Sequence, residues 1–180
     1  MVIPFQISVE HGEICLFPIG FVAPCHDWTE DDVAQGFCWH ETQIAFLTLQ
    51  YEGIIEVTVE IENELELRPD AIRTIQVPFF IREDSAISIW PVSAMWYSIP
   101  EGEYCLVYQI GLKPFISEER KKLGDFTPEW DDMWCVFTFI RQDNVEAKIL
   151  RQDDKLNPPT PLFTRQRSPK PFILRSAPPE

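Results

Sequence analysis

The sequence has little positive charge, few glycines and no long apolar run. Its 180 residues include 15 Lys and Arg against 29 Asp and Glu, which gives a formal net charge of −14 at pH 7. A chain this acidic repels nucleic acid and anionic lipid, and it attracts basic proteins and cations. No stretch approaches the roughly 20 apolar residues that a membrane helix needs. We therefore expect neither direct nucleic-acid binding nor membrane insertion.

The features of an exported or disulfide-bonded protein are missing as well. Residues 1–5 lack the basic head and the long apolar core of a signal peptide. The cysteines are odd in number, and no pair has the Cys-x-x-Cys spacing of a zinc or redox motif. We expect a cytoplasmic protein whose thiols are free and buried. The five cysteines are Cys15, Cys25, Cys38, Cys105 and Cys135.

Motifs that carry catalysis or hold a cofactor are also absent. The seven glycines are scattered and form no phosphate-binding loop, and no zinc-helix pattern occurs. Cys25 and His26 are adjacent, but neighbouring side chains rarely face each other, and no third orienting group is identifiable. We predict that the protein is not an enzyme and has no cofactor. A hydrolase would need a deep pocket that holds a histidine or a close carboxylate pair.

The dominant hydrophobic period is two residues, which is typical of β-strands. Hydrophobic residues make up 45% of the chain, enough to fill a core. Many short strands separated by turn signals favour an antiparallel β-sandwich over alternating βα units. We therefore predict an all-β fold. The expected strands are residues 6–9, 14–17, 37–40, 44–50, 54–61, 74–81, 86–89, 94–99, 104–112, 135–141 and 145–150.

Two short connecting helices and a C-terminal tail complete the predicted organisation. Thr29 is a typical N-cap, with acids in the first turn and Gly36 as the stop. A second helix is expected from Ser117 to Gly124, with acids early and lysines late. Seven of the 16 prolines lie in the last 25 residues. We expect a domain of residues 1–152, followed by a Pro-rich basic tail of residues 153–180.

An acidic segment with one tryptophan, residues 27–32, is the most informative feature of the chain. Residues 1–152 hold 10 basic and 26 acidic residues. An aromatic ring can anchor a partner while carboxylates around it steer the approach. Acidity for solubility alone is the alternative, and Trp28 could equally hold the loop together internally. We expect the main partner contact at Asp27, Trp28, Glu30, Asp31 and Asp32.

The predicted strand 54–61 offers a second candidate face. Glu56 and Glu60 point one way in an extended chain, whereas Val57 and Val59 point the other way. Carboxylates two residues apart stand about 6.6 Å from each other. Such a row can imitate a phosphate backbone to an enzyme that acts on nucleic acid. The alternative is a solvated outer face whose acids prevent aggregation at a sheet edge.

A second acidic segment, residues 125–132, has the same mixture of acids and tryptophan. Sandwich loops hold calcium with such clusters, but neither segment has the spacing and glycine of an EF-hand loop. The alternative function is therefore a calcium- or ligand-binding β-sandwich module. That module requires the two acidic segments to converge around a small cavity. The partner-binding interpretation needs them on an open, convex surface.

Four segments taken together resemble the competence protein J family. Residues 27–37 look like its Asp-Trp-Thr, short acidic helix and Gly-aromatic segment, and residues 44–46 match the strand that follows there. Residues 74–81 are similar to its Val-Pro-Phe strand, and residues 99–104 resemble its Leu-Pro-Lys-Gly-Asp-Tyr turn. The segments occur in the same order with compatible spacing.

The resemblance implies a small intracellular inhibitor from transformable bacteria. Such an inhibitor binds a metal-dependent DNA nuclease, the DNA-entry nuclease, and blocks its active site. The acidity of the chain is independently consistent with this, because a nuclease site is basic and built for phosphates. We expect non-enzymatic inhibition of a basic, metal-dependent DNA nuclease through an acidic surface that occludes the active site. Glu56 and Glu60 form the second candidate surface.

Overall fold

Two β-sheets and one short helix make up the described structure. The computed structural model describes residues 4–18, 28–40, 43–82, 86–113 and 133–164. Within these ranges the chain is all-β apart from the helix α1 (Glu30–Gln35), as the sequence predicts. The second predicted helix, residues 117–124, and residues 165–180 of the predicted tail lie outside the described residues.

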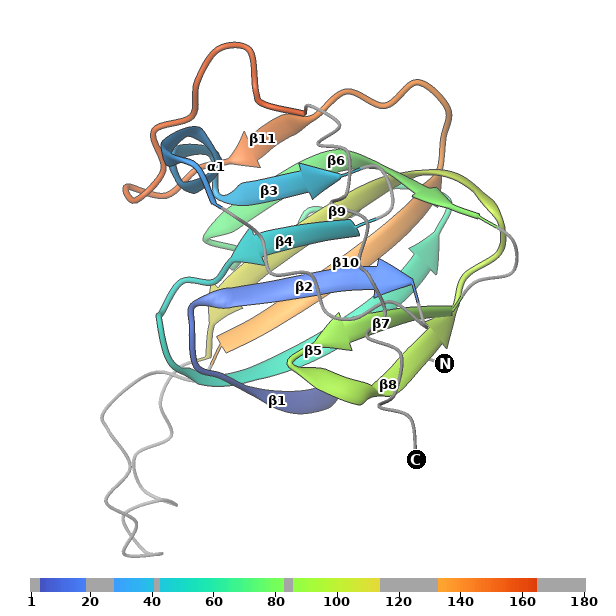
Figure 1. Ribbon diagram of the computed structural model, residues 1–180, viewed down its shortest axis with the longest axis horizontal. Helices are drawn as coiled ribbons and strands as arrows, with labels where there is room; N and C mark the ends of the chain where they lie inside the picture. Colours follow the sequence, from blue (N-terminus) through green and yellow to red (C-terminus); the bar gives the residue numbers. More distant parts are fainter. Residues whose placement is uncertain (1–3, 19–27, 41–42, 83–85, 114–132, 165–180) are drawn as a thin grey trace, which may run out of the picture.

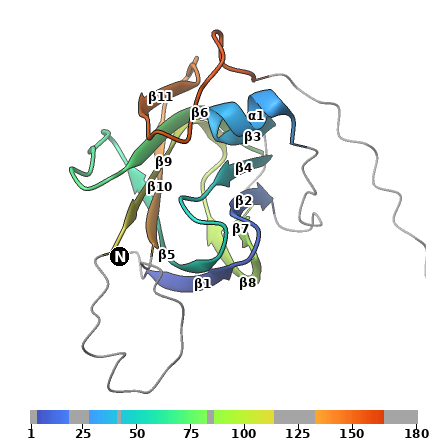
Figure 2. The same ribbon diagram turned by 90° about the vertical axis from the view of Figure 1, so that its left-hand side faces the viewer.

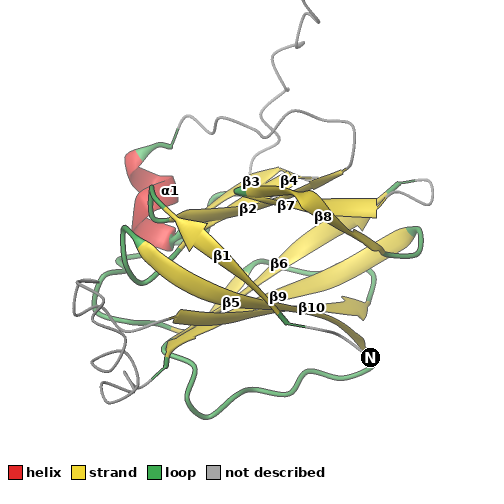
Figure 3. Cartoon of the chain, turned by 90° about the horizontal axis from the view of Figure 1, so that it is seen from below, coloured by secondary structure: helices red, strands yellow, loops and turns green. Residues whose placement is uncertain are grey.

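The two sheets have six and five strands. The larger sheet has the order β1 (Phe5–Val9), β5 (Gly53–Glu62), β10 (Met133–Arg141), β9 (Gly102–Leu112), β6 (Arg73–Ile81) and β11 (Lys148–Arg151). The smaller sheet has the order β3 (Phe37–His40), β4 (Gln43–Leu47), β2 (Glu13–Pro18), β7 (Ala86–Trp90) and β8 (Val92–Ser98). Figures 2 and 3 show the sheets as two layers, with α1 at one end of the smaller one.

The alternation predicted for strand 54–61 is present in β5. Ile55, Val57 and Val59 are buried, while the residues between them are partly exposed. The strand ends at Glu62, where the alternation of the sequence also ends. Because consecutive side chains of a strand point to opposite faces, the apolar residues of β5 face the second sheet and its carboxylates face outward.

One ladder corrects the prediction of a purely antiparallel fold. β10 pairs with β5 in parallel, from Met133 opposite Ile55 to Ile140 opposite Glu62. Every other ladder between described strands is antiparallel. β10 lies between β5 and β9, so it joins a strand that precedes it by some 70 residues. Local periodicity carries no information about the direction of such a distant partner.

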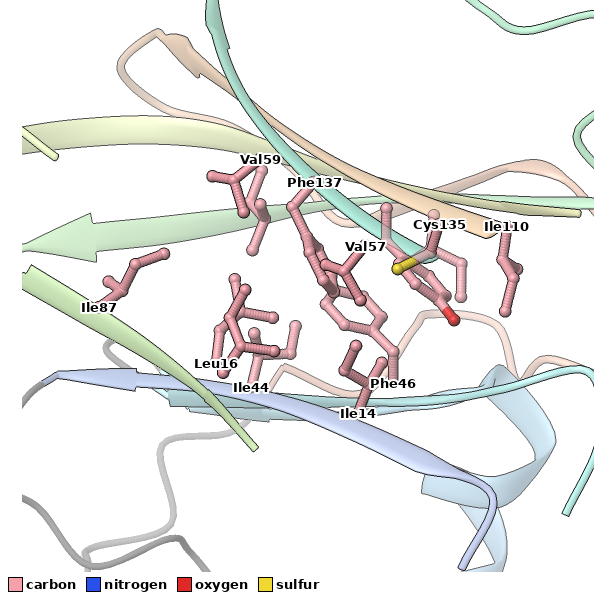
Figure 4. Packing of buried hydrophobic residues seen from close by; sticks show 14 of the residues in the cluster. Ile14, Leu16, Ile44, Phe46, Val57, Val59, Ile87, Ile110, Cys135 and Phe137 are labelled. Carbon is pink, nitrogen blue, oxygen red and sulfur yellow. The ribbon is translucent and has the colours of Figure 1, made fainter. Parts of the chain in front are cut away.

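Side chains of both sheets meet in one aromatic core. The ring of Phe46, from β4, stacks on Tyr108, from β9, with centroids 4.4 Å apart. Tyr108 stacks in turn on Phe137, from β10, at 5.3 Å. Figure 4 shows Phe46 and Phe137 pointing toward each other from opposite layers, among aliphatic residues. The stacked rings therefore contribute to holding the two sheets together.

The segment 63–72 covers the outer face of the larger sheet. Gln109 is 1% exposed there, accepts a hydrogen bond from the Arg68 amide at 2.9 Å and donates one to the Glu66 carbonyl at 3.0 Å. The Arg68 guanidinium lies 5.6 Å from the centre of the Trp134 ring. This cover explains why β10 is buried along nearly its whole length and reads as a continuous apolar run.

Buried charge attaches the chain after β11 to the two sheets. Arg73 is 1% exposed and pairs with Asp153 at 2.6 Å. Arg73 also donates to the Leu47 carbonyl, at the end of β4, at 2.8 Å. Leu156, three residues after Asp153, is itself buried. Residues Asp153 and Leu156 of the predicted tail thus pack against the rest of the described structure.

The four described cysteines are buried, as predicted, and Cys105 and Cys135 carry free thiols. Burial raises the pKa of the Cys105 thiol to about 11, with partial opposition from the charge of Lys148. Burial also raises the pKa of Cys135 well above its ordinary value. Both thiols therefore stay protonated at neutral pH and are poor nucleophiles. Among the described residues, no helix is long and apolar enough to cross a membrane.

Replacing Asp153 with Ala is expected to destabilise the protein by about 3–5 kcal/mol, because it leaves the buried charge of Arg73 unpaired. Urea unfolding followed by tryptophan fluorescence measures the loss. The double variant Arg73→Met/Asp153→Leu removes both charges of this pair, and most of the stability should return. A loss below about 1 kcal/mol for Asp153→Ala would show that Arg73 does not need this partner.

Stability should fall between pH 9 and pH 11. The thiol of Cys105 ionises near pH 9 in the unfolded chain but only near pH 11 in the folded protein. Its contribution to stability is therefore complete below pH 9 and is lost as the pH rises toward 11. Urea midpoints measured across this range should fall less steeply for Cys105→Ala than for the wild type. Identical slopes would remove this thiol as a cause.

Candidate partner-binding site

Capping residues determine where the helix α1 begins and ends. Thr29 Oγ1 accepts a hydrogen bond from the Asp32 amide at 3.3 Å, and Asp32 Oδ2 accepts from the Thr29 amide at 2.9 Å. These reciprocal bonds form the capping box that starts the helix. Gly36 ends it with φ +81°, a left-handed conformation that favours glycine. The sequence prediction of this helix and of both its ends is confirmed.

Glu30 and Asp31 are the exposed carboxylates of this helix. Both side chains lie in the first turn and face solvent. Among the residues that the structure describes, no lysine or arginine forms an ion pair with either of them. Negative charge in the first turn is also favourable for the helix dipole. These two residues are therefore available to a partner.

Asp32 corrects the predicted contact set, and Asp27 lies outside the described residues. The Asp32 side chain is only 3% exposed, because its carboxylate is used by the capping box. In the folded protein it supports the helix and does not present a charge at the surface. The acidic segment predicted as one surface is thus divided between exposed and structural residues.

Trp28 is half-buried and attaches the residues just before α1 to the smaller sheet. Its indole Nε1 donates to Glu13 Oε2 at 2.7 Å. Its ring packs against a cluster of buried residues from β2, β3 and β4, which includes Cys15 and Phe17. The internal role considered for this tryptophan is therefore present. The contact also places the start of α1 beside β2.

Glu56 and Glu60, the second candidate face, are paired with cations of the same chain. Glu56 contacts Lys113 at 2.7 Å, and Glu60 contacts Arg68 at 3.1 Å. All four side chains are partly exposed, so the pairs are screened by solvent and contribute little to stability. They nevertheless reduce the negative charge that this face offers to a partner.

Further exposed carboxylates lie where the sequence prediction did not place a contact. Glu62, Glu64 and Glu66 are exposed at the end of β5 and in the segment that covers the sheet. A simple count would have pointed to them: residues 1–67 contain 13 acidic residues and no lysine or arginine. The first cation of the chain, Arg68, is paired with Glu60.

Two of the alternative sites predicted from the sequence, the acidic segment 125–132 and the pair Cys25–His26, lie outside the described residues. Among the described residues, no group of three or more His, Cys, Asp or Glu is placed to hold a metal ion.

One shallow groove lies where β6 separates from the chain before β11. Pro78 has no amide hydrogen, and its carbonyl accepts from Trp39 Nε1 at 2.6 Å. The residues that line the groove include a single carboxylate, Glu103, and no histidine. The groove therefore lacks the histidine or carboxylate pair that the hydrolase alternative requires. It is lined by Trp39, Pro78, Phe79, Phe80, Glu103, Tyr104, Gln142 and Val145.

Two solved structures resemble this fold. One is ComJ from Bacillus subtilis, described as the inhibitor of the DNA degrading activity of NucA. It has 18% sequence identity and a TM-score of 0.51, and the match covers 78% of this chain and 99% of that one. The other, described as Crocagin biosynthetic gene J, has 10% identity and a TM-score of 0.47, and the match covers 79% and 97%.

Curated proteins give no match to the chain. The model of the family Competence protein J (ComJ) matches residues 6–140. This match includes α1 and the strands β2 to β9 in full. It omits the first residue of β1, the last residue of β10 and all of β11. The chain belongs to the competence protein J family.

Proposed function

We propose that this protein inhibits a DNA-degrading nuclease by binding it, without catalysis of its own. The family membership of residues 6–140 carries the proposal. The fold shared with ComJ, the inhibitor of NucA, supports it. The net charge of −14 supports it independently, since an enzyme that binds DNA presents positive charge toward the phosphates.

The inhibitory surface in this proposal is centred on α1. Glu30 and Asp31 enter or cover the basic active site of a metal-dependent nuclease and occupy positions that DNA phosphates would otherwise take. Two observations support this role for Glu30 and Asp31: both are exposed, and neither forms an ion pair with a described lysine or arginine. The remaining negative charge steers the nuclease toward this face over distances of about a Debye length.

The frame of the inhibitor in this proposal is a β-sandwich in the cytoplasm. The shared aromatic core of the two sheets supports the sandwich. The free buried thiols of Cys105 and Cys135 support a reducing compartment. A rigid frame suits an inhibitor, because a surface fixed before binding loses little conformational entropy on association.

Inhibition should weaken as salt is added. A DNA cleavage assay with purified NucA, and with any nuclease that co-purifies from the native cell, measures the inhibition constant at about 50 and 300 mM salt. Because the contact is between opposite charges near the surface, we expect roughly a tenfold or greater loss across this range. No inhibition of either nuclease at low salt contradicts the proposed function.

Removing the charges of α1 should cost more affinity than removing paired charges elsewhere. The variant Glu30→Gln/Asp31→Asn is expected to weaken inhibition by roughly tenfold or more, because two unpaired carboxylates at the contact are lost. The same nuclease assay, together with titration calorimetry, measures the change.

The matched control is Glu56→Gln/Glu60→Gln, which changes the net charge by the same two units. Its carboxylates are already paired with Lys113 and Arg68. Long-range steering changes equally in both variants, so only a local contact separates them. Equal losses in the two variants would remove α1 as the interface and leave a general charge effect.

A further inference from the structure

The chain after β11 packs on α1, although the family match ends at residue 140. Figures 1 and 2 both show the orange-red segment that follows β11 passing beside this helix. The segment 153–164 comes from outside the matched residues, whereas α1 lies inside them. Contacts between the segment 153–164 and α1 therefore connect residues beyond the family match with the helix that carries Glu30 and Asp31.

The first contact is at the end of the helix. The Asn157 amide donates to the Ala34 carbonyl at 2.9 Å and satisfies a carbonyl that the helix itself leaves open. Leu156 packs over Gly36, where a Cβ would stand only 2.8 Å from Leu156 Cδ2. The glycine that ends the helix therefore also makes room for the segment.

The second contact is made by the fully buried carboxamide of Gln35. Its Nε2 donates to the Phe163 carbonyl at 3.0 Å, and its Oε1 accepts from the Phe163 amide at 2.7 Å. The same Nε2 donates to the Phe37 carbonyl at 3.0 Å. One side chain thus satisfies a backbone amide and carbonyl as a neighbouring strand would, and it joins α1, β3 and the segment.

The segment also has attachments outside the helix, to β6 and to the chain that follows β4. Asp153 pairs with the buried Arg73, and the Lys155 ammonium donates to the Leu49 carbonyl. A helix of six residues has no independent stability in water, so its position depends on such contacts. Thr29 and Trp28 hold its first turn, and the segment 153–164 holds its last.

We propose that the segment 153–164 is a positioning element for nuclease recognition, and that Gln35 of α1, which binds this segment, is the main positioning residue. The segment fixes α1 so that the first turn presents Glu30 and Asp31 to a basic partner in one orientation. The inference rests on the proposed function. It adds that residues beyond the family match, which never touch the nuclease in this arrangement, set the affinity of the inhibitor.

The test is the full-length variant Gln35→Met, which keeps the volume of the side chain and removes its hydrogen bonds. Inhibition of NucA, or of the co-purifying nuclease, should weaken roughly tenfold. In hydrogen exchange, the amides of Val33 and Gly36, which bond within α1, should lose protection selectively. A second variant, Leu156→Ala, removes the apolar contact at Gly36 and should act in the same direction if Gln35→Met does not fold.

The control is Ile87→Val, a truncation in β7 that loosens the core away from α1. β7 and α1 are at different ends of the smaller sheet, since α1 contacts β3 and β7 is fourth in the strand order. This variant should lose stability without losing inhibition at 25 °C.

The outcomes separate the two proposals. If the wild type inhibits neither nuclease, the proposed function fails, and this inference fails with it. If the wild type inhibits and both Gln35→Met and Leu156→Ala inhibit equally well, only the positioning role is overturned. Unchanged protection of the Val33 and Gly36 amides would also overturn it. A loss of inhibition in Ile87→Val equal to that in Gln35→Met would assign the effect to general stability.

Discussion

The buried guanidinium of Arg73 is the interaction on which the rest of the structure depends. A charge inside an apolar core is costly unless a counter-ion and hydrogen-bond acceptors surround it. Here Leu47, at the end of a strand of the smaller sheet, supplies a carbonyl, and Asp153 supplies the carboxylate. One side chain of β6 therefore joins both sheets and the chain after β11. The arrangement of α1 follows, because Asp153 begins the segment that packs against it.

The surface is acidic because acids outnumber lysines and arginines, and also because several of these cations make contacts within the protein. Several of the few basic side chains serve internal purposes. Arg73 is buried, Arg68 lies over Trp134, and Arg151 donates to carbonyls of the covering segment. The first 67 residues contain no lysine or arginine at all. Carboxylates in that part of the chain consequently lack a nearby cation unless a later residue reaches them. Among the described residues, this happens at Glu56 and Glu60 but not at Glu30.

Local patterns predicted the elements well and the long-range relations poorly. Alternation in residues 54–61 and the signals at Thr29 and Gly36 gave a strand and a helix that the structure contains. The same signals could not reveal that β10 pairs in parallel, because the direction of its neighbour β5 depends on residues far away in the sequence. They also could not distinguish exposed Asp31 from buried Asp32, because adjacent acids look alike until the capping geometry decides. The counter-ions of the Glu56 face depended on residues up to 57 positions away.

The position of β10 has a consequence for how the protein is made. This strand separates β5 from β9, so the larger sheet has no continuous order until residue 141 has left the ribosome. Until then β5 has one edge without its final neighbour, and pairing across such a sequence distance is slow compared with hairpin formation. The nascent chain thus carries an exposed strand edge from the completion of β5 at Glu62 until Arg141 is made. The outward-facing carboxylates of β5 place like charges along that edge, and this disfavours its pairing with the same strand of a second copy.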